Sequence, residues 1–208
     1  MSFLDLMKQL FQHTAEPGEH PEQVKRLRER LSADPNDIEA FTELVEIAQN
    51  AEAQHPPADP LIAEHTGTGT APAVSANLAI WALAEELSGN PSSWYPQLQL
   101  AKLSLPADAA GAVRCLHTVA DRNPSGQVLA ACINILAQAG VPDQALSLGL
   151  AHWDPATHGF GAARALIEAA LAAGREKDAR TYANQYVPYA NNAEKRELAA
   201  LVTPSDAA

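Results

Sequence analysis

Short amphipathic segments separated by Asx-Pro turns are the feature that most constrains the fold of this chain. The turns stand at Asp34-Pro35, Asn90-Pro91, Asn123-Pro124 and Asp154-Pro155. The last three are 33 and 31 residues apart, and the first gap of 56 residues fits one such unit plus a long loop. Because Asp and Asn cap helices and proline cannot continue one, each turn predicts the end of one helix and the start of another.

Apolar residues between the turns recur with the period of an α-helix. We expect helices over about residues 2–12, 21–32, 37–53, 75–88, 93–105, 108–121, 126–139, 142–152, 158–173, 175–187 and 191–202. No segment alternates as a strand does, and aromatic residues make up only 5% of the chain, which argues against a β-sandwich or barrel. Gly140 and Gly174 follow helices at the position where a left-handed residue ends them.

The longest break in the helical pattern is residues 54–74, which are rich in proline, glycine and threonine. Loops of this length are unusual in a compact array and often carry function. We expect a loop there that is either mobile or functional, for example as a small-molecule or metal site.

Each unit between the turns contains a pair of helices with related patterns. The second helix opens with alanine and has apolar residues four and seven positions later, as in Ala112, Leu116 and Val119. Over residues 21–190 this order, closed by proline, resembles the tetratricopeptide repeat, a helix–turn–helix unit of about 34 residues. A generic α-solenoid with the same helix pairing is the alternative.

The resemblance implies an all-α fold, namely an α-solenoid of about four TPR-like hairpins over residues 21–190. Residues 1–20 would add an N-terminal amphipathic helix and a linker, and residues 191–208 a C-terminal capping helix and tail. Hairpins must stack because one amphipathic hairpin cannot bury its own apolar face. Leu198 and Leu201, beside charged neighbours, suit a capping helix.

The N-terminal helix carries one apolar face, formed by Phe3, Leu6, Met7, Leu10 and Phe11. Three roles fit this apolar face: it could cap the first hairpin, dock on a partner or a second copy, or bind to a membrane surface. The polar side has one lysine and one aspartate, unlike a basic interfacial helix. Docking would make the chain an assembly subunit or a homo-oligomer.

Acidic residues outnumber basic residues, 25 to 14, and give a net charge of −11. Nucleic-acid binding needs clustered lysine and arginine, so we expect no nucleic-acid partner. The excess lies in residues 1–90, which hold 15 acidic and 5 basic residues. If charge selects a partner, it does so near this end of the chain and favours a basic one.

First helices line the inner groove of tetratricopeptide arrays, so the resemblance implies a peptide-binding groove. Its residues would be Glu39, Thr42, Glu46 and Gln49, then Tyr95, Gln99 and Lys102, then Asn134. A solvated helix face is the alternative explanation of the acidic residues. The groove hypothesis predicts a basic or amphipathic peptide as the partner.

No nucleophile elbow, glycine-rich phosphate loop or paired-carboxylate motif is present in the sequence, so we expect no catalytic site, metal site or cofactor. His152 and His158 flank a turn without the spacing of helical metal ligands. His117 and Asp121 fit a surface ion pair at i, i+4. The cysteines, Cys115 and Cys132, fall in apolar helical stretches, which favours buried thiols in a reducing interior.

These observations predict a cytoplasmic, non-catalytic adaptor or scaffold that binds another protein or a peptide in its groove. The alternatives are the assembly subunit and a ligand site at the loop over 54–74. No stretch of about 18 apolar residues is present, so we expect no transmembrane helix.

Overall fold

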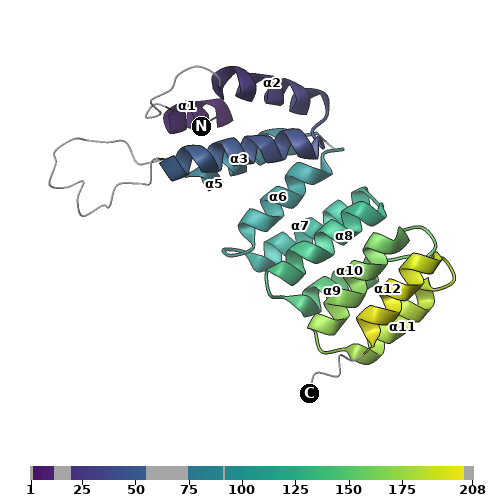
Figure 1. Cartoon of the computed structure of the whole chain (residues 1–208). Coiled ribbons are helices and arrows are strands. Elements are labelled where there is room, and N and C mark those ends of the chain that lie inside the picture. Colours follow the sequence, from purple (N-terminus) through teal and green to yellow (C-terminus); the bar gives the residue numbers. More distant parts are fainter. Residues whose placement is uncertain (1, 12–19, 55–74, 91, 204–208) are drawn as a thin grey trace. The chain divides into compact units, whose positions relative to one another are not determined.

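The part of the chain that the structure describes is all-helical. A computed structural model describes residues 2–11, 20–54, 75–90 and 92–203, among which there are eleven helices and no strand (Figure 1). The helices are α1 (Phe3–Phe11), α2 (His20–Ala33), α3 (Ile38–Gln54), α5 (Ala76–Ser88), α6 (Trp94–Ser104), α7 (Ala109–Arg122), α8 (Gly126–Gln138), α9 (Pro142–His152), α10 (Gly159–Ala172), α11 (Glu176–Tyr186) and α12 (Asn192–Val202). Each begins and ends within one residue of its predicted bounds, so the all-α prediction is confirmed. The predicted loop lies, apart from Gln54, outside the described residues.

Local signals explain where many of the helices begin and end. The side chains that cap the following helix by accepting a backbone N–H from its first turn are those of Ser75, Asp108, Ser125 and Asn191. Asp37 does the same for α3 by accepting the N–H of Ala40 at 3.0 Å. Gly140 and Gly174 have φ angles of 76° and 71°, which confirms the predicted left-handed residues after α8 and α10.

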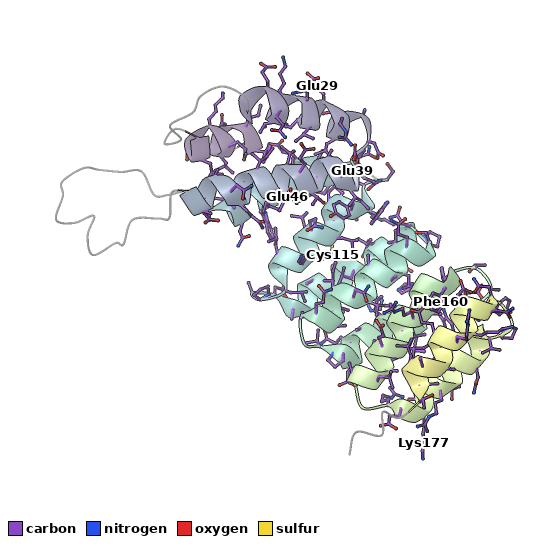
Figure 2. All side chains as sticks on the ribbon, in the orientation of Figure 1. Glu29, Glu39, Glu46, Cys115, Phe160 and Lys177 are labelled. Carbon is purple, nitrogen blue, oxygen red and sulfur yellow. The ribbon has the colours of Figure 1, made fainter. Side chains whose placement is uncertain are left out.

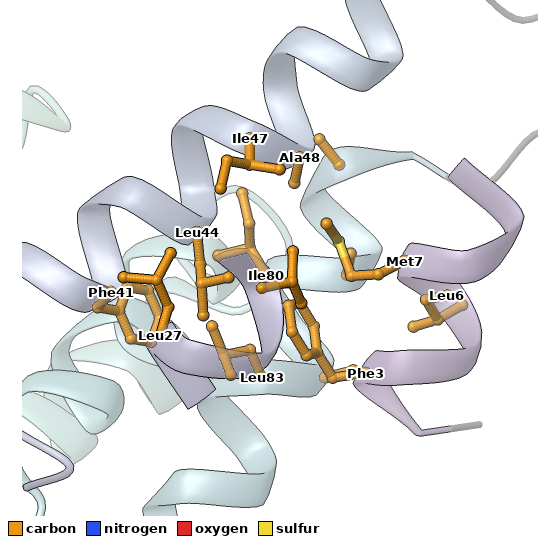
Figure 3. Packing of buried hydrophobic residues seen from close by; sticks show 14 of the residues in the cluster. Phe3, Leu6, Met7, Leu27, Phe41, Leu44, Ile47, Ala48, Ile80 and Leu83 are labelled. Carbon is orange, nitrogen blue, oxygen red and sulfur yellow. The ribbon is translucent and has the colours of Figure 1, made fainter. Parts of the chain in front are cut away.

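The chain folds into two compact units, Met1–Leu103 and Ser104–Ala208. In the first unit α3 packs against α1, α2 and α5, and α1 also packs against α5. The apolar faces of these helices meet in one core, part of which is drawn in Figure 3. Phe41 and Leu44 of α3 are buried there, and Tyr95 of α6 packs against the same core.

Helix α1 contributes directly to this core. Phe3, Leu6 and Met7 are at most 2% exposed, and Leu10 is 7% exposed. Figure 3 shows Phe3 and Met7 turned inward with Ile80 of α5. At these four residues, the face that the sequence offered for docking is therefore covered by the chain itself. The fifth residue of that face, Phe11, has a side chain outside the described part.

The carboxylate of Glu86 in α5 binds the first residue of α1 and thereby fixes the start of that helix. One carboxylate oxygen, Oε1, accepts the backbone N–H of Phe3 at 2.8 Å, and the other, Oε2, accepts a guanidinium N–H of Arg28 in α2 at 2.8 Å. The guanidinium carbon of Arg28 also lies 5.7 Å from the centre of the Phe3 ring. Because the first N–H groups of a helix have no partner within it, a carboxylate placed there stabilises the helix end. One carboxylate thus joins three helices.

In the second unit each helix packs against the next one along the chain, from α7 to α12. In addition α8 packs against α10, α10 against α12, and α7 against α9. Three pairs of alternate helices therefore lie side by side in this unit. Helix α10 lies in the middle of this order and buries seven side chains, including Leu166 and Ile167.

Helix α12 covers α10 and α11 at the C-terminal side of the second unit. Leu198 is buried in that contact, and Leu201 is half-buried. Glu197 forms an ion pair with Arg164 of α10, with Oε1 and Nη1 2.7 Å apart. The outer residues Lys195 and Arg196 are exposed, so the helix turns a charged side to solvent.

Two glycines allow very close packing in the second unit. A Cβ atom at Gly126, the first residue of α8, would lie 1.7 Å from the carbonyl oxygen of His158, in the turn before α10. A Cβ atom at Gly149 of α9 would lie 2.6 Å from Cδ1 of Leu166 and 3.0 Å from Cδ1 of Ile133. Gly126 therefore lets two backbone segments touch where any side chain would hold them apart.

We predict that Gly126→Ala destabilises the protein by about 3 kcal/mol, at the upper end of the cost of overpacking, because backbone must move to admit the methyl group. The measurement is the free energy of unfolding in urea. Gly161→Ala in α10 is the matched control, since nothing lies within 4 Å of the added Cβ. That control should be neutral or stabilising, by up to about 1 kcal/mol. Equal effects of the two substitutions would contradict the close contact at Gly126.

Candidate functional site

The exposed polar residues of α3 form a row on the side away from its buried face. Glu39, Thr42, Glu46 and Gln49 follow one another at i, i+3, i+7 and i+10, so they fall on one narrow side of the helix. All four are exposed, and Glu39 and Glu46 are labelled in Figure 2. We call these four residues the α3 polar row.

The negative charge of the α3 polar row is only partly balanced. Arg30 of α2 pairs with Asp37 at 2.8 Å and reaches Glu39 at 3.5 Å. The Glu39 side chain is nevertheless 91% exposed, and an ion pair of that kind contributes little. Glu46 has no ion pair with any residue in the described part of the chain. Glu43 faces elsewhere, since its Oε1 accepts an N–H from Gln23 of α2 at 2.6 Å.

The predicted groove residues of α6 lie in different surroundings. Tyr95 is half-buried, and its ring stands edge-on to that of Phe41 with the centres 5.4 Å apart. Gln99 is half-buried and Lys102 is exposed. Tyr95 therefore holds α6 against the core of the first unit, and Lys102 is the most accessible of the three.

The structure brings the predicted groove residues together only in part. Glu39, Thr42, Glu46 and Gln49 lie on one face of one helix, and the three residues of α6 belong to the same unit. Asn134 is exposed on α8, in the second unit.

A residue that the sequence did not single out, Asn36, fixes the start of α6. Its side-chain oxygen accepts the backbone N–H groups of Trp94 and Tyr95 at 2.8 and 3.0 Å, and its amide nitrogen donates to the carbonyl of Ser92 at 2.9 Å. Ser93, directly before α6, is fully buried and donates its hydroxyl to the carbonyl of Asn90 at 2.6 Å. Asn36 therefore caps a helix that begins 58 residues further along the chain.

The structure places His117 beside a histidine of another helix. His117 faces His152 of α9, with Nδ1 and Nε2 3.0 Å apart, and Asp121 lies 3.4 Å from Nδ1 of His152. The expected i, i+4 pair of His117 with Asp121 is therefore replaced by a contact between α7 and α9. His158 stays local, because its Nδ1 accepts the backbone N–H of Asp154 at 2.9 Å.

Burial and electrostatics act on both the histidine pair and the cysteines. The pKa of His117 is lowered, first by burial and then by the neighbouring His152, while Asp121 opposes this shift. The thiol of Cys132 is buried and donates weakly to the carbonyl of Leu116 at 3.7 Å. Burial, assisted by the nearby Cys115, raises the pKa of Cys132 to about 12. This thiol is therefore protonated and unreactive at neutral pH.

Among the residues that the structure describes, no three His, Cys, Asp or Glu side chains are grouped so that they could hold a metal ion. The metal and ligand hypothesis for the loop concerns residues outside that part. No described helix has both the length and the apolar character needed to cross a membrane. Comparison with known protein families, curated proteins and solved structures finds no match to this chain.

We predict that Asn36→Ala destabilises the first unit by about 2 kcal/mol, because two N–H groups at the start of α6 lose their acceptor. Asn36→Asp keeps the acceptor oxygen and should cost less. Near-UV circular dichroism should also change, since Trp94 and Tyr95 lie at the affected helix end.

Asn50→Ala is the matched control for this prediction, because Asn50 is an exposed asparagine on α3. Its free energy of unfolding should stay within about 0.5 kcal/mol of that of the unmodified chain. An Asn36→Ala variant as stable as this control would show that the long-range cap is not needed.

Proposed function

We propose that the chain is a non-catalytic, TPR-like adaptor or scaffold that works in the cytoplasm and binds a basic peptide or protein segment. The α3 polar row carries the proposal. Its two glutamates are held in register on a rigid helix, and among the described residues their charge is balanced only by the 3.5 Å contact of Glu39 with Arg30. In the proposed array of helical hairpins, α3 and α6 are first helices, so their exposed sides would line the groove.

Recognition would depend on a surface that exists before the partner arrives. Phe41 and Leu44 anchor the buried side of α3, so the opposite side cannot rearrange freely. A partner that meets such a preformed surface loses less free energy to ordering of the site. Basic side chains on the partner would contact Glu39 and Glu46, and Thr42 and Gln49 between and beside them would add hydrogen bonds.

The assembly alternative has less support. A chain that self-associates through α1 would have to expose Phe3, Leu6 and Met7, which α3 and α5 cover. Exposing them would remove part of the core of the first unit. We therefore favour recognition through the polar side of α3 over docking through the apolar side of α1.

The test is binding of a library of amphipathic peptides that carry lysine and arginine, measured by fluorescence anisotropy at two salt concentrations. We predict that Glu39→Lys combined with Glu46→Lys weakens binding of the peptides that the unmodified chain prefers by about tenfold or more, because two favourable ion contacts become repulsive. Binding to the unmodified chain should weaken as salt rises.

The matched control combines Glu29→Lys of α2 with Glu85→Lys of α5. Both glutamates are exposed in the same unit, and the change in net charge is equal. This control should retain binding within a few-fold, and circular dichroism should show that both double variants are folded. If both double variants lose binding equally, the effect comes from net charge and the proposed role of the α3 polar row is wrong. If neither variant loses binding, that role is wrong as well.

A further inference from the structure

The imidazoles of His117 and His152 are in contact at a partly exposed position of the second unit. The two imidazoles come from different helices of the second unit, α7 and α9, which pack against each other. Their facing nitrogens, Nδ1 of His117 and Nε2 of His152, are 3.0 Å apart. We propose that this pair is a binding site for one divalent transition-metal ion, with Zn²⁺ as the representative, and that these two nitrogens are its protein ligands.

The spacing of the rings fits a shared metal ion. A tetrahedral zinc ion holds imidazole nitrogens at about 2.0–2.1 Å. Each ring centre lies about 1.1–1.2 Å behind its nitrogen, so two such ligands have their ring centres about 5.2 Å apart. The ring centres of His117 and His152 are 5.2 Å apart. With the nitrogens 3.0 Å apart and close to the line between the ring centres, the observed contact is a hydrogen bond between the rings. Metal binding would turn both rings so that their lone pairs converge on the ion, and it would move the nitrogens about 0.3 Å further apart.

The position of Asp121 supports the same assignment. Its Oδ1 lies 3.4 Å from Nδ1 of His152, on the far side of the ring from His117. Histidines that bind metals almost always donate their second ring N–H to a carboxylate or carbonyl, which fixes the tautomer and orients the ring. With the proton on Nδ1 directed at Asp121, Nε2 of His152 turns its lone pair toward His117. Asp121 is therefore a positioning residue in this proposal and not a ligand.

The histidine pair is only partly buried, so water can reach an ion held there. The His152 side chain is 16% exposed and that of Asp121 is 69% exposed, so the pair lies at the edge of the packed helices. Two imidazoles satisfy two of the four positions of a tetrahedral ion, and water can fill the others. Imidazole nitrogens favour zinc, copper and nickel over magnesium and calcium, which prefer oxygen ligands.

A bound ion would act on the fold as a bridge between α7 and α9. Both helices are anchored by buried residues next to the ligands, Leu116 beside His117 and Leu148 one turn before His152. A ligand that binds only the folded state raises its stability in proportion to the logarithm of ligand concentration. The site would thereby make the stability of the second unit depend on metal supply.

The experiment is a zinc titration of the full-length chain after treatment with a chelator, followed by calorimetry and by thermal unfolding. We expect saturable binding of one zinc ion per chain and a rise in the unfolding temperature. His117→Gln and His152→Gln should each abolish both effects, and Asp121→Asn should weaken binding by about tenfold or more. A chain in which His13, His20, His55 and His65 are all glutamine is the control and should bind as before.

Imidazole resonances of the unmodified chain give a readout that does not depend on any variant folding. The ring nitrogens of His117 and His152 should shift together during the titration, with the saturation seen by calorimetry, and those of His158 should not. Absence of saturable binding would overturn the proposal. So would zinc binding that survives in His117→Gln and His152→Gln, or that is lost in the control with four substitutions.

Discussion

The burial of one apolar face per helix is the constraint on which both units of this protein depend. A helix of eleven or so residues gains little from its own hydrogen bonds, so it needs neighbours that cover its apolar side. In the first unit that cover is completed by α1, which places Phe3, Leu6, Met7 and Leu10 in the core. Burial of one such side chain contributes roughly 1.5–3 kcal/mol. The summed contribution of four such side chains is comparable to the whole free energy of unfolding of a typical domain, about 5–15 kcal/mol.

The helices could be predicted from the sequence because their signals are local. Apolar periodicity, Asx-Pro turns and capping side chains all act within a few residues, and each helix in the described part of the chain begins and ends within one residue of its predicted position. The same holds for the left-handed glycines after α8 and α10.

The contacts that hold the helices in place could not be predicted in the same way, since they join residues far apart in the chain. Asn36 caps α6 across 58 residues, and Glu86 accepts the N–H of Phe3 across 83. Gly126 meets the carbonyl of His158, so its lack of a side chain matters only in the folded unit. A single Asn, Glu or Gly has no sequence pattern that reveals such a role.

The candidate sites also differ in whether they depend on local sequence patterns or on contacts between distant residues. The α3 polar row could be predicted because its four residues lie on one helix and its spacing is periodic. Its continuation to Tyr95 was less predictable, since the pairing of that ring with Phe41 depends on how α6 meets α3. The histidine pair lay outside prediction altogether: the sequence paired His117 with Asp121, and only the packing of α7 on α9 brings His152 between them.

Hydrogen–deuterium exchange of the intact chain shows directly whether α1 is a structural part of the first unit. Because the apolar face of α1 is buried against α3 and α5, its hydrogen-bonded amides should open only when that core opens. We predict that amides in the second half of α1 exchange at rates close to those in the middle of α3 and α5. Exchange of α1 at the rate of an unprotected peptide, while α3 and α5 stay protected, would contradict it.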